Sequence, residues 1–117
     1  MGSDELCIRA DLRRRRDRAA ADVATREGDL RAVFEASRSS NADDEHDPEG
    51  STIAFERAQL AAVLESARRQ VADLDAALAR VDAGTYGICA VCGREIPAER
   101  LVARPSARTC VGCAGRG

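Results

Sequence analysis

The stretch Cys89–Cys113, with the sequence CAVCGREIPAERLVARPSARTCVGC, decides how the C-terminal end of this chain is built. It holds two C-x2-C pairs, Cys89 with Cys92 and Cys110 with Cys113, and seventeen residues separate the pairs. Such pairs at this separation are typical of a tetrahedral site in which four thiolates bind one Zn2+. Because four thiolates leave no position for an activated water, we expect one structural zinc ion.

The composition of the chain suits long exposed helices better than a compact globule. Its 117 residues include three aromatic side chains and no Trp, and all 18 basic residues are Arg. A globule of this length would normally bury more large side chains. No stretch approaches the roughly 20 apolar residues that span a bilayer, and the N-terminus lacks an apolar signal core. We therefore expect a cytoplasmic protein without membrane contact, in which thiolates bind metal rather than form disulfides. Cys7 is left over and is interpreted as an incidental free thiol.

Residues 51–83 carry the clearest helical pattern. Apolar side chains recur at alternating spacings of three and four, and only Arg57 interrupts them: Ile53, Leu60, Leu64, Ala67, Val71, Leu74, Leu78 and Val81. This stripe is the seam of a coiled coil or a helical hairpin. Ser51 or Thr52 can cap the start of the helix, and Gly84 ends it.

Residues 4–39 carry a weaker version of the same pattern, at Leu12, Ala19, Val23, Leu30, Phe34 and Ser37. The connecting segment Ser40–Gly50 is short, and short connections favour antiparallel neighbours. We therefore predict a mainly α fold with two domains. Residues 1–83 form a long antiparallel coiled-coil hairpin with an acidic tip at about 41–50, and residues 84–117 form a four-cysteine zinc-finger module.

The predicted tip concentrates acidic side chains, because five acids fall within seven residues: Asp43, Asp44, Glu45, Asp47 and Glu49. Such crowding is unfavourable unless solvent, a cation or a basic partner relieves it. A solvated turn is one interpretation, and a tip that reaches into a basic or metal-containing cavity is the other. The lone His46 among these acids is interpreted as a solvated loop residue.

Other candidate functional patterns are weaker. The run Arg13–Arg16 spreads around a helix between two aspartates, so we interpret it as solvated surface rather than a phosphate contact. The sequence has no P-loop and no Gly-rich dinucleotide fingerprint. Paired carboxylates occur only at the tip, where a turn offers no cleft to separate their pKa values. We therefore expect no enzymatic activity.

The stretch Ala77–Cys113 resembles the C-terminal zinc finger of the TraR/DksA family of transcription regulators. The shared elements are Gly84-Thr85-Tyr86-Gly87, Cys89-x2-Cys92-Gly93, Ile96-Pro97, and Arg100-Leu101-x-Ala103-Arg104-Pro105 leading to Cys110-x2-Cys113. The upstream hairpin also fits the plan of the family. The resemblance therefore covers roughly residues 10–113.

The resemblance implies a regulator that binds RNA polymerase directly, without sequence-specific DNA binding. Its coiled coil would enter the secondary channel and modulate initiation, often together with guanosine tetraphosphate. The tip motif of the family, Asp-x-x-Asp-x-Ala, is matched by Asp44 and Asp47, and Glu49 stands in place of the Ala. Arg100 and Arg104 match basic positions of the family. They are candidates for contacts with polymerase or the nucleotide, and packing within the zinc module is the alternative.

Two other functions remain open at this stage. A zinc-stabilised helical adaptor would pair its stripe with another protein or with itself, so it would elute as a dimer, whereas the polymerase-binding hypothesis predicts a monomer. A nucleic-acid-binding zinc module would use the Arg-rich C-terminal end and would bind with a steep dependence on salt.

Overall fold

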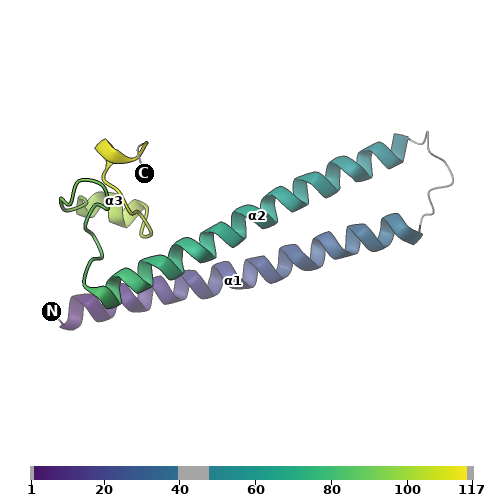
Figure 1. Cartoon of the computed structure of the whole chain (residues 1–117). Coiled ribbons are helices and arrows are strands. Elements are labelled where there is room, and N and C mark those ends of the chain that lie inside the picture. The colour runs from purple at the N-terminus through teal and green to yellow at the C-terminus, as the bar shows by residue number, and fades with distance from the viewer. Residues whose placement is uncertain (1, 40–47, 116–117) are drawn as a thin grey trace. The chain divides into compact units, whose positions relative to one another are not determined.

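The computed structural model describes the backbone of residues 2–39 and 48–115, and the side chains of residues 4–38 and 52–115 (Figure 1). The elements are α1 (Gly2–Ser39), α2 (Pro48–Ala83), α3 (Ala98–Ala103) and the short 3-10 helix η1 (Val111–Cys113). Helices α1 and α2 form an antiparallel hairpin, and the four-cysteine segment follows α2. The predicted mainly α fold is confirmed. Within the described ranges, the only β pairing is an isolated bridge between Ile88 and Glu95.

The boundaries of α2 have clear local causes. The helix begins at Pro48, so the prediction that Ser51 or Thr52 caps it is wrong, since both lie inside the helix. Proline suits a first helical position because its φ is already helical and it has no N–H to leave unpaired. At the other end Gly84 has φ of 77°, and its N–H donates to Val81 O while the N–H of Thr85 donates to Arg80 O. This Schellman motif ends α2 at Ala83.

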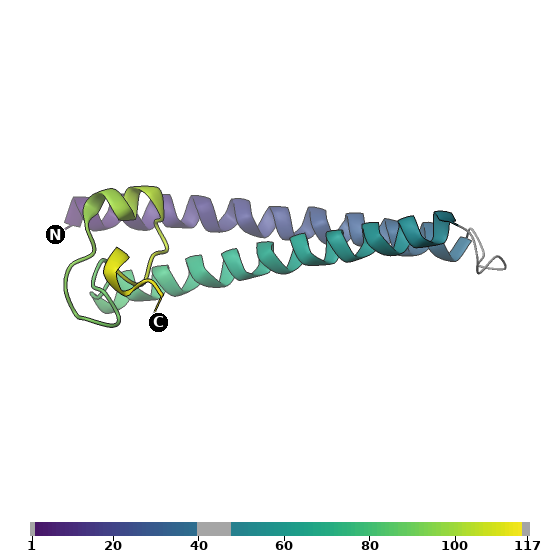
Figure 2. The same ribbon diagram turned by 90° about the horizontal axis from the view of Figure 1, so that it is seen from above.

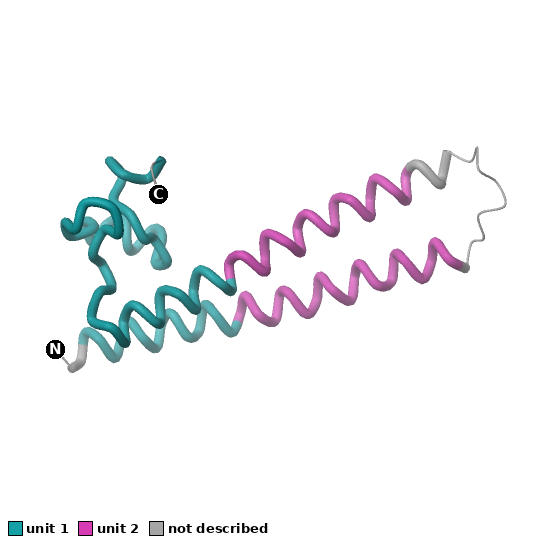
Figure 3. Tube along the Cα trace, in the orientation of Figure 1, with its two compact units in different colours: residues 1–17, 71–117 teal, residues 18–70 magenta. Residues whose placement is uncertain are grey.

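The chain divides into two compact units (Figure 3). Unit 1 comprises residues 1–17 and 71–117, which are the first turns of α1, the last turns of α2 and the cysteine module. Unit 2 comprises residues 18–70, which are the remaining turns of both long helices. The predicted domain boundary between residues 83 and 84 stays a prediction.

Unit 1 has a well-buried seam between its two helix segments. Leu12 of α1 and Leu74, Ala77 and Val81 of α2 are all buried. Ala77 is fully buried whereas the adjacent Leu78, which the pattern had placed in the seam, is half-buried. Ion pairs flank this seam, with Arg9 bound to Asp82 at 2.7 Å and Arg16 bound to Asp75 at 2.9 Å. Packing of this seam aligns the two helices, and the ion pairs, whose carboxylates are exposed, add at most modest stability.

Helix α3 lies against the first turns of α1 within unit 1. Helix α3 and the first turns of α1 line an apolar groove of about 410 Å3, and Figure 2 shows α3 over those turns of α1. Cys7 and Ile8 of α1 and Leu101 and Val102 of α3 are among its walls.

Unit 2 has a thinner seam. Ala19, Leu64 and Ala67 are buried, and the other predicted seam residues are at best half-buried. Phe34 is 45% exposed, and the guanidinium carbon of Arg57 lies 5.0 Å from the centre of its ring. Arg57 thus occupies the seam as a cation–π partner of Phe34 instead of as a defect. In the described part of the chain, no helix has an apolar stretch long enough to cross a bilayer.

Candidate metal centre

The first cysteine pair lies in a tight turn after α2. The N–H of Gly93 donates to Cys89 O at 3.0 Å, and the N–H of Cys92 points to Cys89 Sγ at 3.5 Å. Gly93 has φ of 74°, a conformation that side chains disfavour, so glycine is needed to close this turn. The N–H of Cys89 donates to Arg94 O at 2.8 Å, which folds the chain back on itself. This geometry turns both thiols to one side.

The second cysteine pair lies at η1. The N–H of Cys113 donates to Cys110 O at 3.1 Å, which places the two sulfur atoms on the same side of a single helical turn. The two turns are joined by a hydrogen bond from Ala90 N–H to Arg108 O at 2.8 Å. This backbone hydrogen bond thus links the turns of two pairs that are seventeen residues apart in the sequence.

The four sulfur atoms of Cys89, Cys92, Cys110 and Cys113 all lie within 4.8 Å of one another. The Sγ atoms of Cys92 and Cys110 are 3.9 Å apart. A tetrahedral Zn2+ with Zn–S distances of about 2.3 Å requires sulfur atoms roughly 3.8 Å apart, so this cluster fits the ion. Four thiolates complete the coordination shell, and the site is therefore structural.

A small apolar core surrounds the sulfur atoms. Cys89 is 2% exposed and Cys113 is 8% exposed, and Ile96 is buried against them with Leu101 and Cys110 packed alongside. Cys92 is exposed, so one edge of the cluster faces solvent. With so few apolar residues, this core is too small to hold the module without a metal ion.

The surroundings shift the pKa values of two thiols of the cluster in opposite directions. The N–H of Cys92, followed by that of Cys110, lowers the pKa of the Cys89 thiol to about 6. The hydrogen bond with Cys110, followed by burial, raises the pKa of the Cys113 thiol to about 12. A bound Zn2+ would hold all four sulfur atoms as thiolates, so its binding would release the protons that they carry.

The two arginines predicted to contact polymerase or an effector have different surroundings. Arg100 Nε donates to Thr109 O at 2.8 Å, so this side chain already packs within the module. Arg104 is exposed. Both line a shallow cavity of about 230 Å3 together with Arg108 and Asp73. The three arginines line one cavity, and the roles of Arg100 and Arg104 as contacts stay predictions.

The predicted tip residues cannot be placed in the same way. Asp44, Asp47 and His46 lie outside the described residues, and Glu49 lies in the first turn of α2 without a described side chain. Their proposed role therefore rests on the sequence. Cys7 is a free, exposed thiol on α1, away from the four-cysteine cluster.

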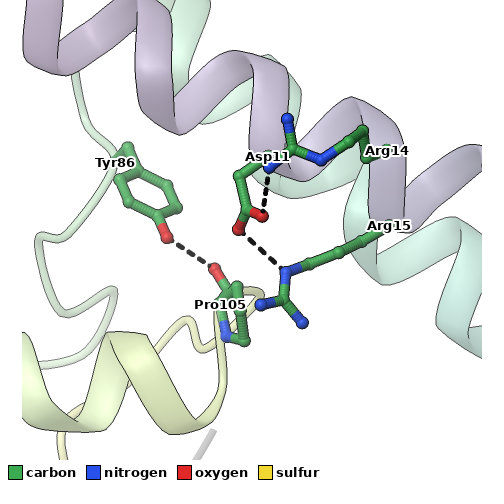
Figure 4. A network of polar contacts seen from close by, with 5 residues as sticks. All are labelled: Asp11, Arg14, Arg15, Tyr86 and Pro105. Atoms are coloured by element: carbon green, nitrogen blue, oxygen red, sulfur yellow. Dashed lines mark hydrogen bonds and ion pairs between the residues drawn. The ribbon is translucent and has the colours of Figure 1, made fainter.

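Arg80 of α2 joins the cysteine module to the hairpin within unit 1, and the hydroxyl of Tyr86 adds a contact inside the module. Tyr86 Oη donates to Pro105 O at 2.7 Å, and beside it Asp11 binds Arg14 at 3.0 Å and Arg15 at 2.8 Å (Figure 4). Arg80 Nη2 donates to Ser106 O and Ala107 O. The partners in the Tyr86 and Arg80 contacts are 19 to 27 residues apart, so no local sequence pattern could have predicted these hydrogen bonds.

These features define a helical hairpin that carries a four-cysteine zinc finger. Residues 84–116 match the family model of the prokaryotic dksA/traR C4-type zinc finger. The solved structure of transcription factor DksA2 from Pseudomonas aeruginosa matches 98% of this chain and 83% of that chain, with a TM-score of 0.79 and 24% identity. The C-terminal segment of the chain thus matches the dksA/traR C4-type zinc finger, and the chain as a whole has the fold of the DksA2 structure.

Curated relatives resemble the chain over shorter stretches. The uncharacterized protein YteA of Bacillus subtilis is 41% identical over 66 residues, which are 56% of this chain and 28% of YteA. The RNA polymerase-binding transcription factor DksA of Haemophilus influenzae is 39% identical over 46 residues, which are 39% of this chain and 32% of that protein. The matched stretches thus span less than a third of the length of these two relatives.

Proposed function

We propose that this chain regulates transcription by binding RNA polymerase directly, with the acidic end of its hairpin inserted into the secondary channel to modulate initiation. The likeness to the DksA2 structure over 98% of the chain, together with the zinc-finger match, is the observation that carries the proposal. The Haemophilus influenzae relative is named as an RNA polymerase-binding transcription factor. In this role the chain is a cytoplasmic monomeric regulator and not an enzyme.

Within this proposal Asp44 and Asp47 act on the polymerase, and Glu49 modifies their effect. The charge distribution supports an acidic hairpin end. Residues 18–70 contain eleven acids against seven arginines, whereas the rest of the chain contains nine acids against eleven arginines. An acidic end is attracted toward a channel that leads to catalytic Mg2+, and the attraction raises the rate of productive encounters.

Arg104 is the better candidate for a contact with polymerase or with guanosine tetraphosphate. Its side chain is exposed, and in the described part of the chain it has no hydrogen bond or ion pair. Arg100 is held by Thr109 O, so its replacement would disturb the module as well as any contact. Asp73 lines the same cavity and would repel an anion, so guanosine tetraphosphate is an effector to be tested after polymerase itself.

A photocrosslink at the tip tests the proposal. A photoreactive residue in place of His46, in the purified zinc-loaded protein, should crosslink to the large catalytic subunits of the cognate RNA polymerase. A second secondary-channel factor in excess should abolish the product. The same photoreactive residue in place of Glu65, an exposed position on α2 in unit 2, marks contacts outside the tip. A folded protein that gives no tip crosslink, or one insensitive to the competitor, would overturn the channel mechanism and favour an adaptor.

A further inference from the structure

The segment Pro105–Thr109 connects α3 to the second cysteine pair and ends next to Cys110. It has no regular secondary structure, yet the carbonyls from Arg104 through Thr109 all accept hydrogen bonds. Two bonds come from backbone amides, of Ala107 to Arg104 O at 2.9 Å and of Ala90 to Arg108 O at 2.8 Å. The other four carbonyls are bound by side chains.

Those side chains come from three places in unit 1. Arg80, in the last turn of α2, donates to Ser106 O at 3.3 Å and Ala107 O at 3.4 Å. Tyr86, in the turn after α2, donates to Pro105 O at 2.7 Å. Arg100 of α3 donates to Thr109 O at 2.8 Å, one residue before the metal ligand. Each contact is partly buried, where a hydrogen bond is less weakened by competing water.

Arg80 is unusual among the cross-element arginines. Arg9, Arg16 and Arg68 each bind a carboxylate of the other long helix, whereas Arg80 points to backbone carbonyls. Burial and the nearby charge of Arg108 lower its pKa from the ordinary value, so its charge is held at a cost. A guanidinium holds its N–H donors in a fixed plane, and one of its nitrogens, Nη2 of Arg80, donates to both successive carbonyls. The Arg80 side chain therefore holds the segment Pro105–Thr109 in position and does not neutralise a carboxylate.

We propose that Arg80, Tyr86 and Arg100 are positioning residues of the zinc site. They hold the segment before Cys110 so that the second thiolate pair meets the first, and they thereby slow the loss of zinc. An irregular segment without such bonds would gain backbone entropy with each released residue and would draw Cys110 away from the metal. The proposal concerns the metal site alone and stands whether or not the chain binds polymerase.

The test is the rate of zinc transfer from the full-length, zinc-loaded protein to a chromophoric chelator, 4-(2-pyridylazo)resorcinol, well below the melting temperature. Loss of groups that orient metal ligands typically costs about 10–100-fold in metal affinity. We expect Arg80→Met, which keeps an apolar stem but no donor, to release zinc about tenfold faster, at the lower end of that range. Tyr86→Phe removes a single hydroxyl and should accelerate release less. Arg80→Lys, which keeps one donor group, should fall between Arg80→Met and the wild type.

Two controls separate positioning from general stability. Arg94→Met changes an exposed arginine of the same module, and its rate should stay within about twofold of the wild type, since its side chain has no bond in the described structure. Leu64→Ala destabilises the seam of unit 2 without touching the segment, and zinc release should not change. Equal acceleration by Leu64→Ala and Arg80→Met would overturn the proposal.

The visible absorption spectrum of bound Co2+ tests the proposal in a second way, which also applies to variants of reduced stability. Co2+ bound to four thiolates in a tetrahedron has a characteristic visible absorption, which reports the geometry at the metal. The Co2+-loaded Arg80→Met and Tyr86→Phe proteins should show a weakened or shifted band, while Arg94→Met should match the wild type. Wild-type spectra and wild-type release rates for both Arg80→Met and Tyr86→Phe would contradict a positioning role.

Discussion

Units 1 and 2 are built from the same two helices, yet they are stabilised in different ways. Of the ten buried apolar residues in the described chain, seven belong to unit 1 and three to unit 2. Unit 1 adds the cysteine cluster and the bonds to the segment before Cys110. Unit 2 has two buried alanines and Leu64, with Phe34 and Phe55 exposed. The same helical hairpin can therefore be firmly packed along one part and held by small side chains and surface charges along another.

This difference has a consequence for function. A segment with few buried contacts opens locally at low free-energy cost, so unit 2 should fluctuate more than unit 1. In the proposed mechanism unit 2 carries the acidic tip residues, which must adjust to the inside of a channel. Unit 1 carries the metal, which preserves the fold while unit 2 adapts.

Loss of the metal should have the largest effect, and it should fall on unit 1. Cys92→Ser removes one of four thiolates and leaves the remaining cluster with weak affinity for zinc. Because structural zinc contributes about 10–16 kcal/mol to the folding of small zinc modules, we expect loss of zinc and a strongly lowered melting temperature. Zinc content and thermal melting measure this. Cys7→Ser is the matched control, since Cys7 is exposed and outside the cluster. An unchanged melting curve for Cys92→Ser would refute a structural zinc.

Leucine truncations should distinguish the two seams. Leu74 is 3% exposed in unit 1, and Leu74→Ala should lower the free energy of unfolding by about 2–5 kcal/mol, as buried leucines do. Leu60 is half-buried in unit 2, and Leu60→Ala should cost clearly less, about 1–2 kcal/mol. Urea denaturation followed by circular dichroism measures both. Equal losses would mean that the two seams are equally well packed.

The spacing of apolar residues predicted both long helices and most of the seam, because helical periodicity is a local property of the sequence. Leu12, Ala19, Leu64, Ala67, Leu74 and Val81 were predicted in the seam and are buried. The spacing did not identify Ala77, since a small side chain next to Leu78 looks unremarkable until the close approach of two helices is known. Phe34 was placed in the seam and is 45% exposed, with the guanidinium of Arg57 over its ring.

The cysteine spacing predicted the metal cluster for the same reason, since each C-x2-C pair is a local turn. The bonds of Arg80, Tyr86 and Arg100 to the segment before Cys110 were not predicted. Their acceptors are backbone carbonyls, and every residue offers one, so the sequence alone cannot indicate which carbonyl is chosen. Arg100 was considered as a contact for polymerase or as a packing residue, and its bond to Thr109 O supports packing.

Replacing Arg57 by an apolar residue should make the seam of unit 2 more like the apolar seam of unit 1. Arg57→Leu restores the apolar pattern between Ile53 and Leu60, and leucine can pack on Phe34 without desolvating a charge. A cation–π pair at such a half-exposed site is worth about 0.5–1 kcal/mol, so the net gain in stability should be small, about 1 kcal/mol or less. Chemical denaturation measures it, with the exposed Arg69→Leu as control. A loss above about 1 kcal/mol would show that the Arg57–Phe34 contact stabilises unit 2 more than an apolar pair would.

The smallest expected effect concerns pH and Asp11 in unit 1. The Arg15 side chain, which donates to Asp11, lowers the pKa of this carboxyl below 3.8 (Figure 4). Its contribution to stability is therefore complete above pH 3.8 and is lost as the pH falls through the lowered pKa. The pair is solvent-exposed, so Asp11→Asn should cost only a few tenths of a kcal/mol at neutral pH. Melting curves of the two proteins should converge in acid, and a difference that grows below pH 3.8 would contradict this assignment.

In the proposed mechanism the tip acts on the polymerase while the rest of the chain binds it. The most direct test compares transcription and binding for the double variant Asp44→Asn, Asp47→Asn with the cognate RNA polymerase. The control is Glu56→Gln, Glu65→Gln, which removes the same number of charges from exposed positions on α2. We predict that the tip variant binds polymerase with nearly wild-type affinity but no longer changes initiation, while the control retains both. Full regulatory activity of the tip variant would contradict the claim.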